Sequence, residues 1–232
     1  MKTLAIIPAR SGSKGLKDKN IIDLCGRPLI DYTIRAALDS GCFDTVMVST
    51  DSEKYAEISR NCGADVPFLR SEKMSSDTAG SWDVVREVLQ KYSEMGKNYD
   101  YVALLQPTSP LRNKDDIVSA FDILKRDNVN GVVSVTEVAH PVQWCFTLDE
   151  TDSLASFANS PYADMRRQEL AKNYHENGAI YIVDAKKIMD TDYNLHKDNC
   201  IAYRMSRTCS IDIDEEIDLI IAKVMMEKLV RK

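Results

Sequence analysis

The stretch from Leu4 to Asn20, LAIIPARSGSKGLKDKN, constrains the fold of this chain most. It opens with a short apolar run, which is long enough for a buried strand but too short for a globular helix. Pro8 ends the run because proline has no backbone N–H to offer a sheet. The loop that follows contains Gly12 and Gly15, and Asp18 is its single acid in a chain of net charge −6. Its cations are Arg10, Lys14, Lys17 and Lys19.

A strand that feeds such a loop is typical of phosphate binding in α/β proteins. Glycines let backbone N–H groups approach a phosphate closely, and fixed cations neutralise its charge. The loop is not a Walker loop, because Leu16 follows Gly15, and it also lacks the dinucleotide-binding spacing. A basic surface loop without a ligand is the alternative that composition leaves open. We take a phosphate-binding loop as the working hypothesis.

The remainder of the chain alternates apolar runs with helical patterns. Apolar runs predict further strands at 45–49, 101–105, 131–135 and 178–183, with a short extended piece at 66–69. Helical spacing predicts helices at 29–38, 55–62, 82–89, 117–124 and 217–229. This alternation predicts an α/β fold with right-handed crossovers, in which helices cover both faces of a mostly parallel sheet. A chain of 232 residues suits a single domain spanning 1–232.

The alternation breaks between His140 and Asn177. This segment is polar and aromatic but has weak periodicity, and it is longer than a normal connection within a compact domain. We therefore expect residues 140–177 to form an irregular extension that covers a substrate or makes an interface.

Composition excludes several classes of function. The N-terminus has no signal-peptide pattern, and no apolar run approaches the length needed to span a membrane. The six cysteines are scattered, which indicates reduced thiols and a cytoplasmic protein. The net charge of −6 argues against a nucleic-acid partner, because a surface that binds nucleic acid is usually basic.

Candidate functional groups follow the predicted strands, where ligands of open α/β sheets bind. The basic loop follows the first strand, Asp51 the second, and residues 106–112 the fourth. Asp212 and Asp214 alternate near the C-terminus, so an extended backbone would place both carboxylates on one face. Two such carboxylates suit Mg²⁺, which also binds waters and substrate phosphates. Asp214 alone could instead cap the last helix, but the phosphate loop favours a metal role for the pair.

Five segments together resemble the acylneuraminate cytidylyltransferases, the CMP-sialic acid synthetases. They run in order along essentially the whole chain, and their combination is specific although no single one would be. They are IPARSGSKG at 7–15 with Lys19-Asn20, Leu69-Arg70 with 76–79, LQPTSPLR at 105–112, NGAIY at 177–181 and SIDID at 210–214.

The resemblance implies a Rossmann-like nucleotidyltransferase fold and a reaction in which CTP and a nine-carbon 2-keto sugar acid give a CMP-sugar and pyrophosphate. It assigns the CTP site to Arg10, Ser13, Lys14, Lys19, Asn20, Arg70, Ala79 and Ser81. It assigns the sugar site to Gln106, Arg167 and Tyr181, the Mg²⁺ ligands to Asp212 and Asp214, and catalysis to Arg10, Lys19 and Asp212. A metal and fixed cations can stabilise the charge that builds on the α-phosphate, so no dedicated base need be invoked. We expect His140 and His175 to be surface or packing residues.

The resemblance also implies a homodimer in which residues 140–177 reach the partner. Arg167, or its neighbour Arg166, would then meet the sugar carboxylate of the opposite site. The chain departs from the family pattern at Gln143 and at the adjacent arginines Arg166 and Arg167. Both departures concern the predicted sugar site, so the expected cytidylyl transfer is unchanged while the identity of the acid is left open. N-acetylneuraminate is the first expectation for the acid.

Other acids and other classes of protein stay open at this stage. Legionaminate and pseudaminate are alternative acids, and 3-deoxy-manno-octulosonate ranks lower. A sugar-phosphate nucleotidyltransferase would need a second phosphate site, for which we find no second glycine-rich cationic cluster. A non-catalytic nucleotide-binding module should lack Lys19 or the aspartate pair, and the chain has all three residues.

Overall fold

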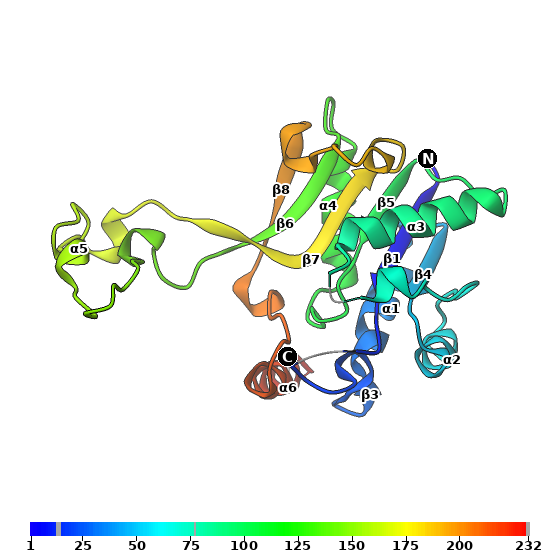
Figure 1. Ribbon diagram of the computed structural model, residues 1–232, viewed down its shortest axis with the longest axis horizontal. Coiled ribbons are helices and arrows are strands. Elements are labelled where there is room, and N and C mark those ends of the chain that lie inside the picture. Colours follow the sequence, from blue (N-terminus) through cyan, green and yellow to red (C-terminus); the bar gives the residue numbers. More distant parts are fainter. Residues whose placement is uncertain (13–14, 77, 231–232) are drawn as a thin grey trace.

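A central six-stranded sheet organises the molecule (Figure 1). The computed structural model describes the chain except residues 13–14, 77 and 231–232. The strand order is β4-β1-β5-β7-β6-β8, and β7 is antiparallel to both of its neighbours while the other pairs are parallel. The strands are β1 (Thr3–Pro8), β4 (Thr45–Ser49), β5 (Tyr101–Leu104), β6 (Gly131–Glu137), β7 (Tyr174–Asp184) and β8 (Cys200–Met205). The predicted mostly parallel sheet is confirmed.

Helices cover both faces of this sheet, as the sequence predicts. Side chains alternate along β1, so Ala5 and Ile7 pack toward one face while Leu4 and Ile6 pack toward the other. The first face carries α1 (Leu29–Ser40), α2 (Glu53–Asn61) and α4 (Lys114–Leu124), and the second carries α3 (Ser81–Glu94). Both faces of β1 are therefore buried, which explains its continuous apolar run.

Local sequence sets the helix ends. Gly41 ends α1 in the left-handed conformation with a φ of 63°, which glycine adopts without steric cost. Ser52 begins α2 by accepting a hydrogen bond from the backbone N–H of Tyr55. Asn113 begins α4 in the same way, with Asp116 completing a capping box.

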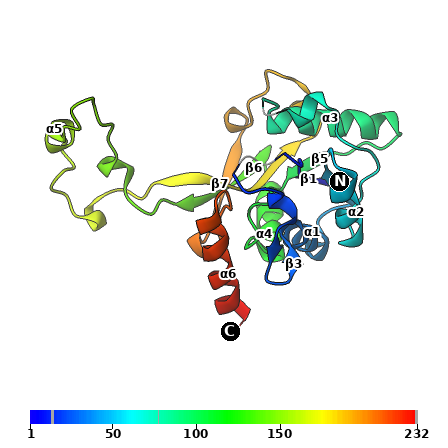
Figure 2. The ribbon, with the colours of Figure 1, turned by 60° about the horizontal axis from the view of Figure 1, so that its bottom comes forward.

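An arm leaves the body where β6 and β7 continue beyond the sheet (Figures 1 and 2). Residues 138–173 form its distal part, which carries α5 (Ala155–Ala158). Within the arm the rings of Phe146 and Phe157 lie 4.9 Å apart, and the Trp144 indole donates to the Tyr162 carbonyl. Most of the segment predicted to be irregular lies in this arm. Its last residues, 174–177, instead belong to β7, because the strand extends past the sheet as a two-stranded ribbon.

The structure differs from the prediction near both ends of the chain. Residues 210–214 form no strand, although Ile213 N donates to Thr108 O at 2.9 Å and so fixes this segment beside the loop after β5. Strand β8 was not predicted, nor was the short hairpin of β2 (Asp23–Leu24) and β3 (Arg27–Pro28). The last helix, α6 (Glu216–Val230), closes this end of the fold.

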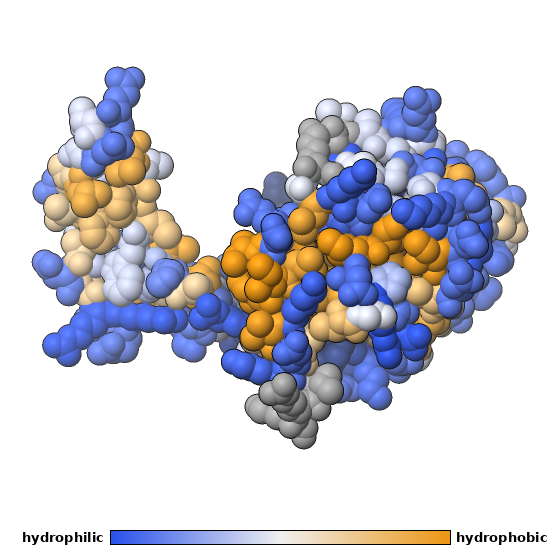
Figure 3. All heavy atoms as spheres, turned by 90° about the horizontal axis from the view of Figure 1, so that it is seen from below, coloured by the Kyte–Doolittle hydropathy of each residue, from blue (hydrophilic) through white to orange (hydrophobic). Residues whose placement is uncertain are grey.

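Helix α6 is apolar on two sides. Leu219, Ala222 and Met226 pack into a small core with Leu24 and Leu111. Another set of its side chains is exposed: Ile217, Ile220, Ile221 and Val224. Figure 3 shows hydrophobic surface at this end of the molecule, next to the arm. No helix in the described part of the chain is both long and apolar enough to cross a bilayer.

Candidate functional site

One cleft of about 620 Å³ gathers most of the residues that the sequence singles out. It lies beside the loops that follow β1 and β5, at the carboxyl ends of these parallel strands. The predicted residues among its walls are Arg10, Lys19, Asn20, Arg70, Ala79, Ser81, Gln106, Asp212 and Asp214. Ser13 and Lys14 lie outside the described residues. Tyr181 and Arg167 do not line the cleft of this chain.

The start of the basic loop is held by Asp51, which follows β4. Ser11 donates to its two carboxylate oxygens from the backbone N–H and from the hydroxyl, each at 2.8 Å. Burial would raise the pKa of Asp51, but the hydrogen bonds from Ser11 outweigh it, so the pKa lies below its usual value. Further along the loop, Asp18 accepts from the Tyr55 hydroxyl at 3.0 Å. Both contacts fix the loop against the β4–α2 region.

The far side of the loop meets the C-terminal segment. A Cβ added to Gly15 would lie 2.6 Å from the carbonyl oxygen of Asp214, so only glycine permits this approach. The Lys19 ammonium lies 2.8 Å from the Asp214 carboxylate. Inside the loop, the Asn20 amide donates to the carbonyl of Arg10. The predicted ribose residue therefore also shapes the loop around the cleft.

Asp212 and Asp214 both line the cleft, so the predicted pair is brought together without a strand. Desolvation raises the pKa of Asp212, and the neighbouring Asp214 charge adds to the shift, whereas a hydrogen bond with Thr108 and the charge of Lys19 oppose it. Thr108 was quoted in a sequence motif but was not assigned to the site. Both carboxylates are negative when ionised, and a shared cation would relieve the repulsion between them.

Helix capping does not account for Asp214. The carboxylate of Asp218 accepts from the backbone N–H groups of Asp214 and Glu215 at 3.0 and 2.9 Å, at the start of α6. That capping alternative is therefore wrong, and the Asp214 side chain points to Lys19 instead. The described residues contain no group of three or more His, Cys, Asp or Glu spaced for a metal. A cation on this pair would need further oxygen ligands from substrate phosphates and water, an arrangement common for Mg²⁺.

Arg70 forms part of the buried wall of the cleft. Its Nη2 and Nε donate to the carbonyl and hydroxyl of Ser49, at 2.6 and 3.0 Å. Nη1 makes no hydrogen bond with a described residue, so it can donate to a ligand. Burial lowers the pKa of Arg70 to about 10, against the opposing charges of Asp51 and Glu87, so the side chain stays cationic at neutral pH. Ser81 begins α3, whose N-terminus adds positive potential here.

Gln106 lines the cleft from the loop after β5, and Tyr181 lies on the neighbouring strand β7. Gln106 follows β5, and its side-chain carbonyl occupies the space where a Cβ of Gly178 would be; Gly178 has a φ of 73°. The ring centroids of Tyr181 and Trp82 lie 5.9 Å apart, and the two rings are nearly perpendicular. Trp82 follows Ser81 in sequence. Burial raises the pKa of Tyr181, and the hydrogen bond with Glu176 raises it further.

Two further residues beside Tyr181 were not predicted from the sequence. The Glu176 carboxylate accepts from the Tyr181 hydroxyl at 3.0 Å, and the His196 imidazole lies 2.6 Å from its other oxygen. Glu176 directly precedes the NGAIY segment, which could have drawn attention to it. His196 has no motif of its own, and the fold alone brings it here.

Arg167 and Arg166 lie on the arm, which projects away from the body of the molecule (Figures 1 and 2). Neither residue lines the cleft. Arg167 begins a short 3₁₀ turn, and Glu169 accepts from the backbone N–H of Arg166. The third predicted sugar residue is therefore not brought together with the others inside one chain.

Comparison with known proteins places this geometry in a family. A model described as cytidylyltransferase matches residues 4–228. Pseudaminic acid cytidylyltransferase of Campylobacter jejuni is 37% identical over 97% of this chain and 96% of its own length. CMP-N,N'-diacetyllegionaminic acid synthase of Legionella pneumophila is 38% identical over 98% and 97% of the two chains. N-acylneuraminate cytidylyltransferase of Escherichia coli O18:K1:H7 is 39% identical over 98% of this chain, which spans 52% of that protein.

A solved structure shares the fold. A CMP:2-keto-3-deoxy-manno-octonic acid synthetase complexed with CTP superposes with a TM-score of 0.74 over 99% of this chain and all of that chain, at 18% identity. The family model covers nearly the whole chain, and the full-length relatives exceed 30% identity. This chain therefore belongs to the cytidylyltransferase family.

Proposed function

We propose that the protein transfers a cytidylyl group from CTP to the free anomeric hydroxyl of a nonulosonic acid, giving the CMP-sugar and pyrophosphate. One observation carries the proposal: a single cleft gathers the cations Arg10, Lys19 and Arg70 together with the carboxylates of Asp212 and Asp214. Cations and carboxylates in one cleft are complementary to a triphosphate carrying a divalent cation.

In the proposed reaction the sugar hydroxyl attacks the α-phosphorus of CTP. A new P–O bond forms to the sugar, the bond between the α- and β-phosphates breaks, and pyrophosphate leaves with the electron pair. Negative charge grows on the phosphoryl oxygens, where Arg10 and Lys19 stabilise it. The hydroxyl proton passes to solvent. The nucleotide sits with its phosphates on the loop at residues 10–20 and its base toward Arg70, Ala79 and Ser81.

Mg²⁺ is the cation that we propose for Asp212 and Asp214. The donor set fits, because both ligands are hard carboxylate oxygens and the phosphates supply more. When bound, the ion would neutralise the growing phosphate charge. The residues of this chain would hold it in place, and Lys19 would exchange its contact with Asp214 for a phosphate oxygen.

We also propose a homodimer in which the arm delivers Arg167, or Arg166, to the partner's sugar site. Two features support this. The arm projects away from the body of the molecule, and apolar side chains are exposed both on the arm, at Phe146 and Leu148, and on α6, at Ile217 and Ile220. Exposed apolar surface of this kind marks protein interfaces. A planar guanidinium can hold a carboxylate with two hydrogen bonds.

The acid that we propose first is N-acetylneuraminate, with pseudaminate and legionaminate as the close alternatives. The relatives that act on these acids have nearly the same identity to this chain, so overall similarity does not choose among them. We propose that the enzyme works in the cytoplasm. Its six cysteines are all free, as expected of a reducing compartment.

The deciding experiment measures pyrophosphate release with CTP, UTP, GTP and ATP, each crossed with N-acetylneuraminate, pseudaminate, legionaminate and 3-deoxy-manno-octulosonate. We expect release only with CTP, and fastest with one nonulosonic acid. A parallel set of reactions offers sugar 1-phosphates in place of the free acids, and pyrophosphate release only in that set would favour the sugar-phosphate nucleotidyltransferase. Binding of CTP without release under every condition would favour the non-catalytic module.

A further inference from the structure

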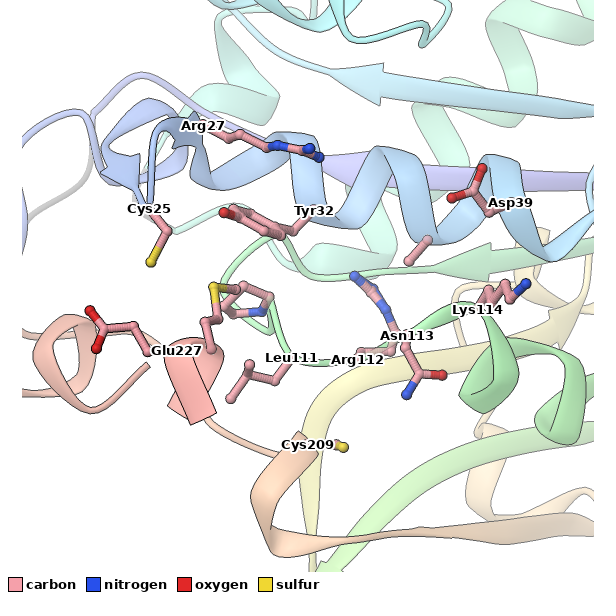
Figure 4. A pocket seen from close by; sticks show the side chains of 13 residues that line it. Cys25, Arg27, Tyr32, Asp39, Leu111, Arg112, Asn113, Lys114, Cys209 and Glu227 are labelled. Carbon is pink, nitrogen blue, oxygen red and sulfur yellow. The ribbon is translucent and has the colours of Figure 1, made fainter. Parts of the chain in front are cut away.

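A second cavity, of about 900 Å³, lies between α1, the start of α4 and α6 (Figure 4). Its walls are mostly apolar and include Tyr32, Leu111 and Met226, which come from three different parts of the chain. None of its lining residues lines the catalytic cleft. Nothing in the proposed reaction uses this space.

The cavity has a buried cation in its wall. Arg112 is 1% exposed, and its Nη2 donates to the Thr33 hydroxyl at 2.6 Å. Among the described residues, its Nε and Nη1 have no hydrogen-bond partner, and both atoms are buried. Asp116 acts on its charge from a distance, while the Asp116 carboxylate accepts from the Tyr203 hydroxyl and from the backbone of Asn113. No ion pair with a described carboxylate holds this guanidinium, so its buried positive charge favours an anion in the adjoining cavity.

The rest of the cavity lining carries both signs of charge. Arg27 and Lys114 are balanced in number by Asp39 and Glu227, so Arg112 leaves one positive charge in excess (Figure 4). Arg27 is 3.6 Å from Asp31, so part of its charge is compensated. The apolar walls would accommodate the apolar part of a ligand, and the cations would favour one negative group on that ligand.

The cavity and the catalytic cleft share three chain segments. Lys19 and Asn20 line the cleft, and Arg27 lines the cavity a few residues later. Gln106 and Thr108 line the cleft, and the same loop then turns to supply the cavity wall at 110–112. The third segment supplies Cys209 to the cavity and Asp212 to the cleft. The backbone bond from Ile213 to Thr108 joins two of these segments.

We propose that this cavity is an effector site for an amphipathic anion, an apolar body carrying one carboxylate or phosphate group. Occupancy changes the affinity of the adjoining cleft for CTP, because each shared segment would have to adjust at both sites together. The binding claim is independent of the proposed function, and the coupling claim rests on CTP binding in the cleft. Coupling of this kind is reciprocal, so CTP changes the affinity for the anion by the same factor.

The first test is a charge series on one apolar tail. Calorimetric titration of the full chain with octanoate, octyl phosphate, octanol and octyltrimethylammonium separates charge from apolar burial. We expect either anion to bind at least tenfold more tightly than the cation, with octanol between them. The better of the two anions identifies the head group. Equal affinity across the series, or no binding at all, overturns the proposal.

Variants locate the binding. Ala36→Phe fills the cavity from α1 and should abolish anion binding, and Lys114→Gln should weaken it several-fold. Arg112→Met should remove the preference for anions. Because Arg112→Met replaces a buried group, the thermal unfolding of this variant is measured first. If Arg112→Met does not fold, Lys114→Gln tests whether the cavity prefers anions. The matched control is Val224→Ser, which alters the exposed face of α6. Loss of binding in the control but not in Ala36→Phe places the ligand on that face and overturns the assignment.

The last test measures coupling. CTP is titrated with Mg²⁺ into the protein with and without saturating octanoate, and octanoate is titrated with and without CTP. We expect equal shifts of at least threefold in both Kd values, which Ala36→Phe removes. Unchanged Kd values overturn the effector role. If CTP fails to bind in any condition, the proposed function fails, whereas the charge series still decides whether the cavity is an anion site.

Discussion

The ammonium of Lys19 and the carboxylate of Asp214 lie 2.8 Å apart although 195 residues separate them in sequence. Each is a proposed ligand for one part of the same substrate, because Lys19 would bind phosphate and Asp214 a metal ion. In the protein alone they neutralise each other. Entry of a metal-bound triphosphate gives each group a new partner of opposite charge, so the ion pair can open without stranding either charge.

The first prediction concerns this pair. Lys19→Met and Asp214→Asn should each lower turnover by roughly 10²-fold or more, because the loss falls on transition-state charge. The free energy of unfolding should change by less than about 1 kcal/mol, since Asp214 is mostly exposed and such pairs contribute little. Steady-state kinetics and denaturant titration measure the two effects. Lys54→Met, which breaks the exposed contact with Asp18, is the control and should leave turnover unchanged. Unfolding of the Lys19 variant would instead mark a structural loop.

The second prediction uses the raised pKa of Asp212. The folded protein holds this proton more tightly than the unfolded chain does. Protonated Asp212 therefore favours the folded state at pH values below the pKa of the unfolded chain. This stabilisation is lost as the pH rises through the pKa of Asp212 in the folded protein. Asp212→Asn should accordingly stabilise the metal-free protein near neutral pH and have little effect in acid. The same variant should lose roughly 10²-fold or more in Mg²⁺-dependent turnover.

Thermal unfolding of the Asp212→Asn variant across the pH range, with chelator present, measures this gain. Asp192→Asn, an exposed acid outside the cleft, is the matched control. Full activity of Asp212→Asn with Mg²⁺, or of the native enzyme in excess chelator, would remove Asp212 from the mechanism.

The third prediction concerns the hydrogen bonds between Ser11 and Asp51. Ser11→Ala removes the hydroxyl bond and should raise KM for CTP by roughly three- to thirtyfold by loosening the loop, at a cost of about 1 kcal/mol in stability. The lowered pKa of Asp51 means that its stabilisation is present above the unfolded pKa and is lost as pH falls through the folded pKa. The variant should therefore lose less stability on acidification than the native protein. Ser40→Ala, which removes a bond to Ala37, should change stability without changing KM.

The fourth prediction concerns the choice of nucleotide. Arg70 and the start of α3 should select CTP, because polar groups placed to pair with one base edge are left unpaired by another. Arg70→Lys replaces a planar guanidinium that has several N–H donors with a single ammonium group. The variant should lower the kcat/KM for CTP, divided by that for UTP, by at least about tenfold. Competition assays with both nucleotides measure the ratio. Equal use of UTP by the native enzyme would refute the assignment.

The fifth prediction tests whether the arm completes the partner's site. A heterodimer of an Arg167→Ala chain with an Asp212→Asn chain should recover one working site, because both defects then fall in the same site. Each homodimer should be nearly inactive, and the purified heterodimer should have about half the activity of the native enzyme. An equimolar mixture that exchanges subunits at random should reach about a quarter, because only half of its dimers are heterodimers. No recovery on mixing, or a fully active monomer, would confine each site to one chain. Arg166→Ala in the same format determines which of the two arginines acts.

Sequence alone predicted the parts of the fold in which burial leaves a local pattern. Strands β1 and β5 are covered on both faces, so each appears as an unbroken apolar run. Strand β8 is an edge strand whose Ile201 and Arg204 are exposed, so no such run marks it. The direction of the arm depends on the ribbon of β6 and β7, which no local pattern encodes.

The residues of the candidate site form the same two groups: those that a local sequence pattern marks and those that only the fold brings together. Residues within motifs, such as Lys19 and Asp212, were predicted because their chemistry is visible in a short window. The pairing of Glu176 with His196 depends on a contact between β7 and the segment that follows it, which only the fold reveals. The sequence also left two interpretations of Asp214. They were resolved by Asp218, whose carboxylate caps α6 and so leaves Asp214 to face the loop.

The cleft takes its cations from the first residues of the chain and its carboxylates from the last, with Gly15 packed directly against Asp214. The two halves of the proposed metal and phosphate site therefore meet only through contacts between distant parts of the chain, which form less readily than local helices and turns. If the segment before α6 detached locally, the sheet would remain but Asp212 and Asp214 would leave the loop. Local opening of this segment would thus abolish activity at a free-energy cost below that of global unfolding.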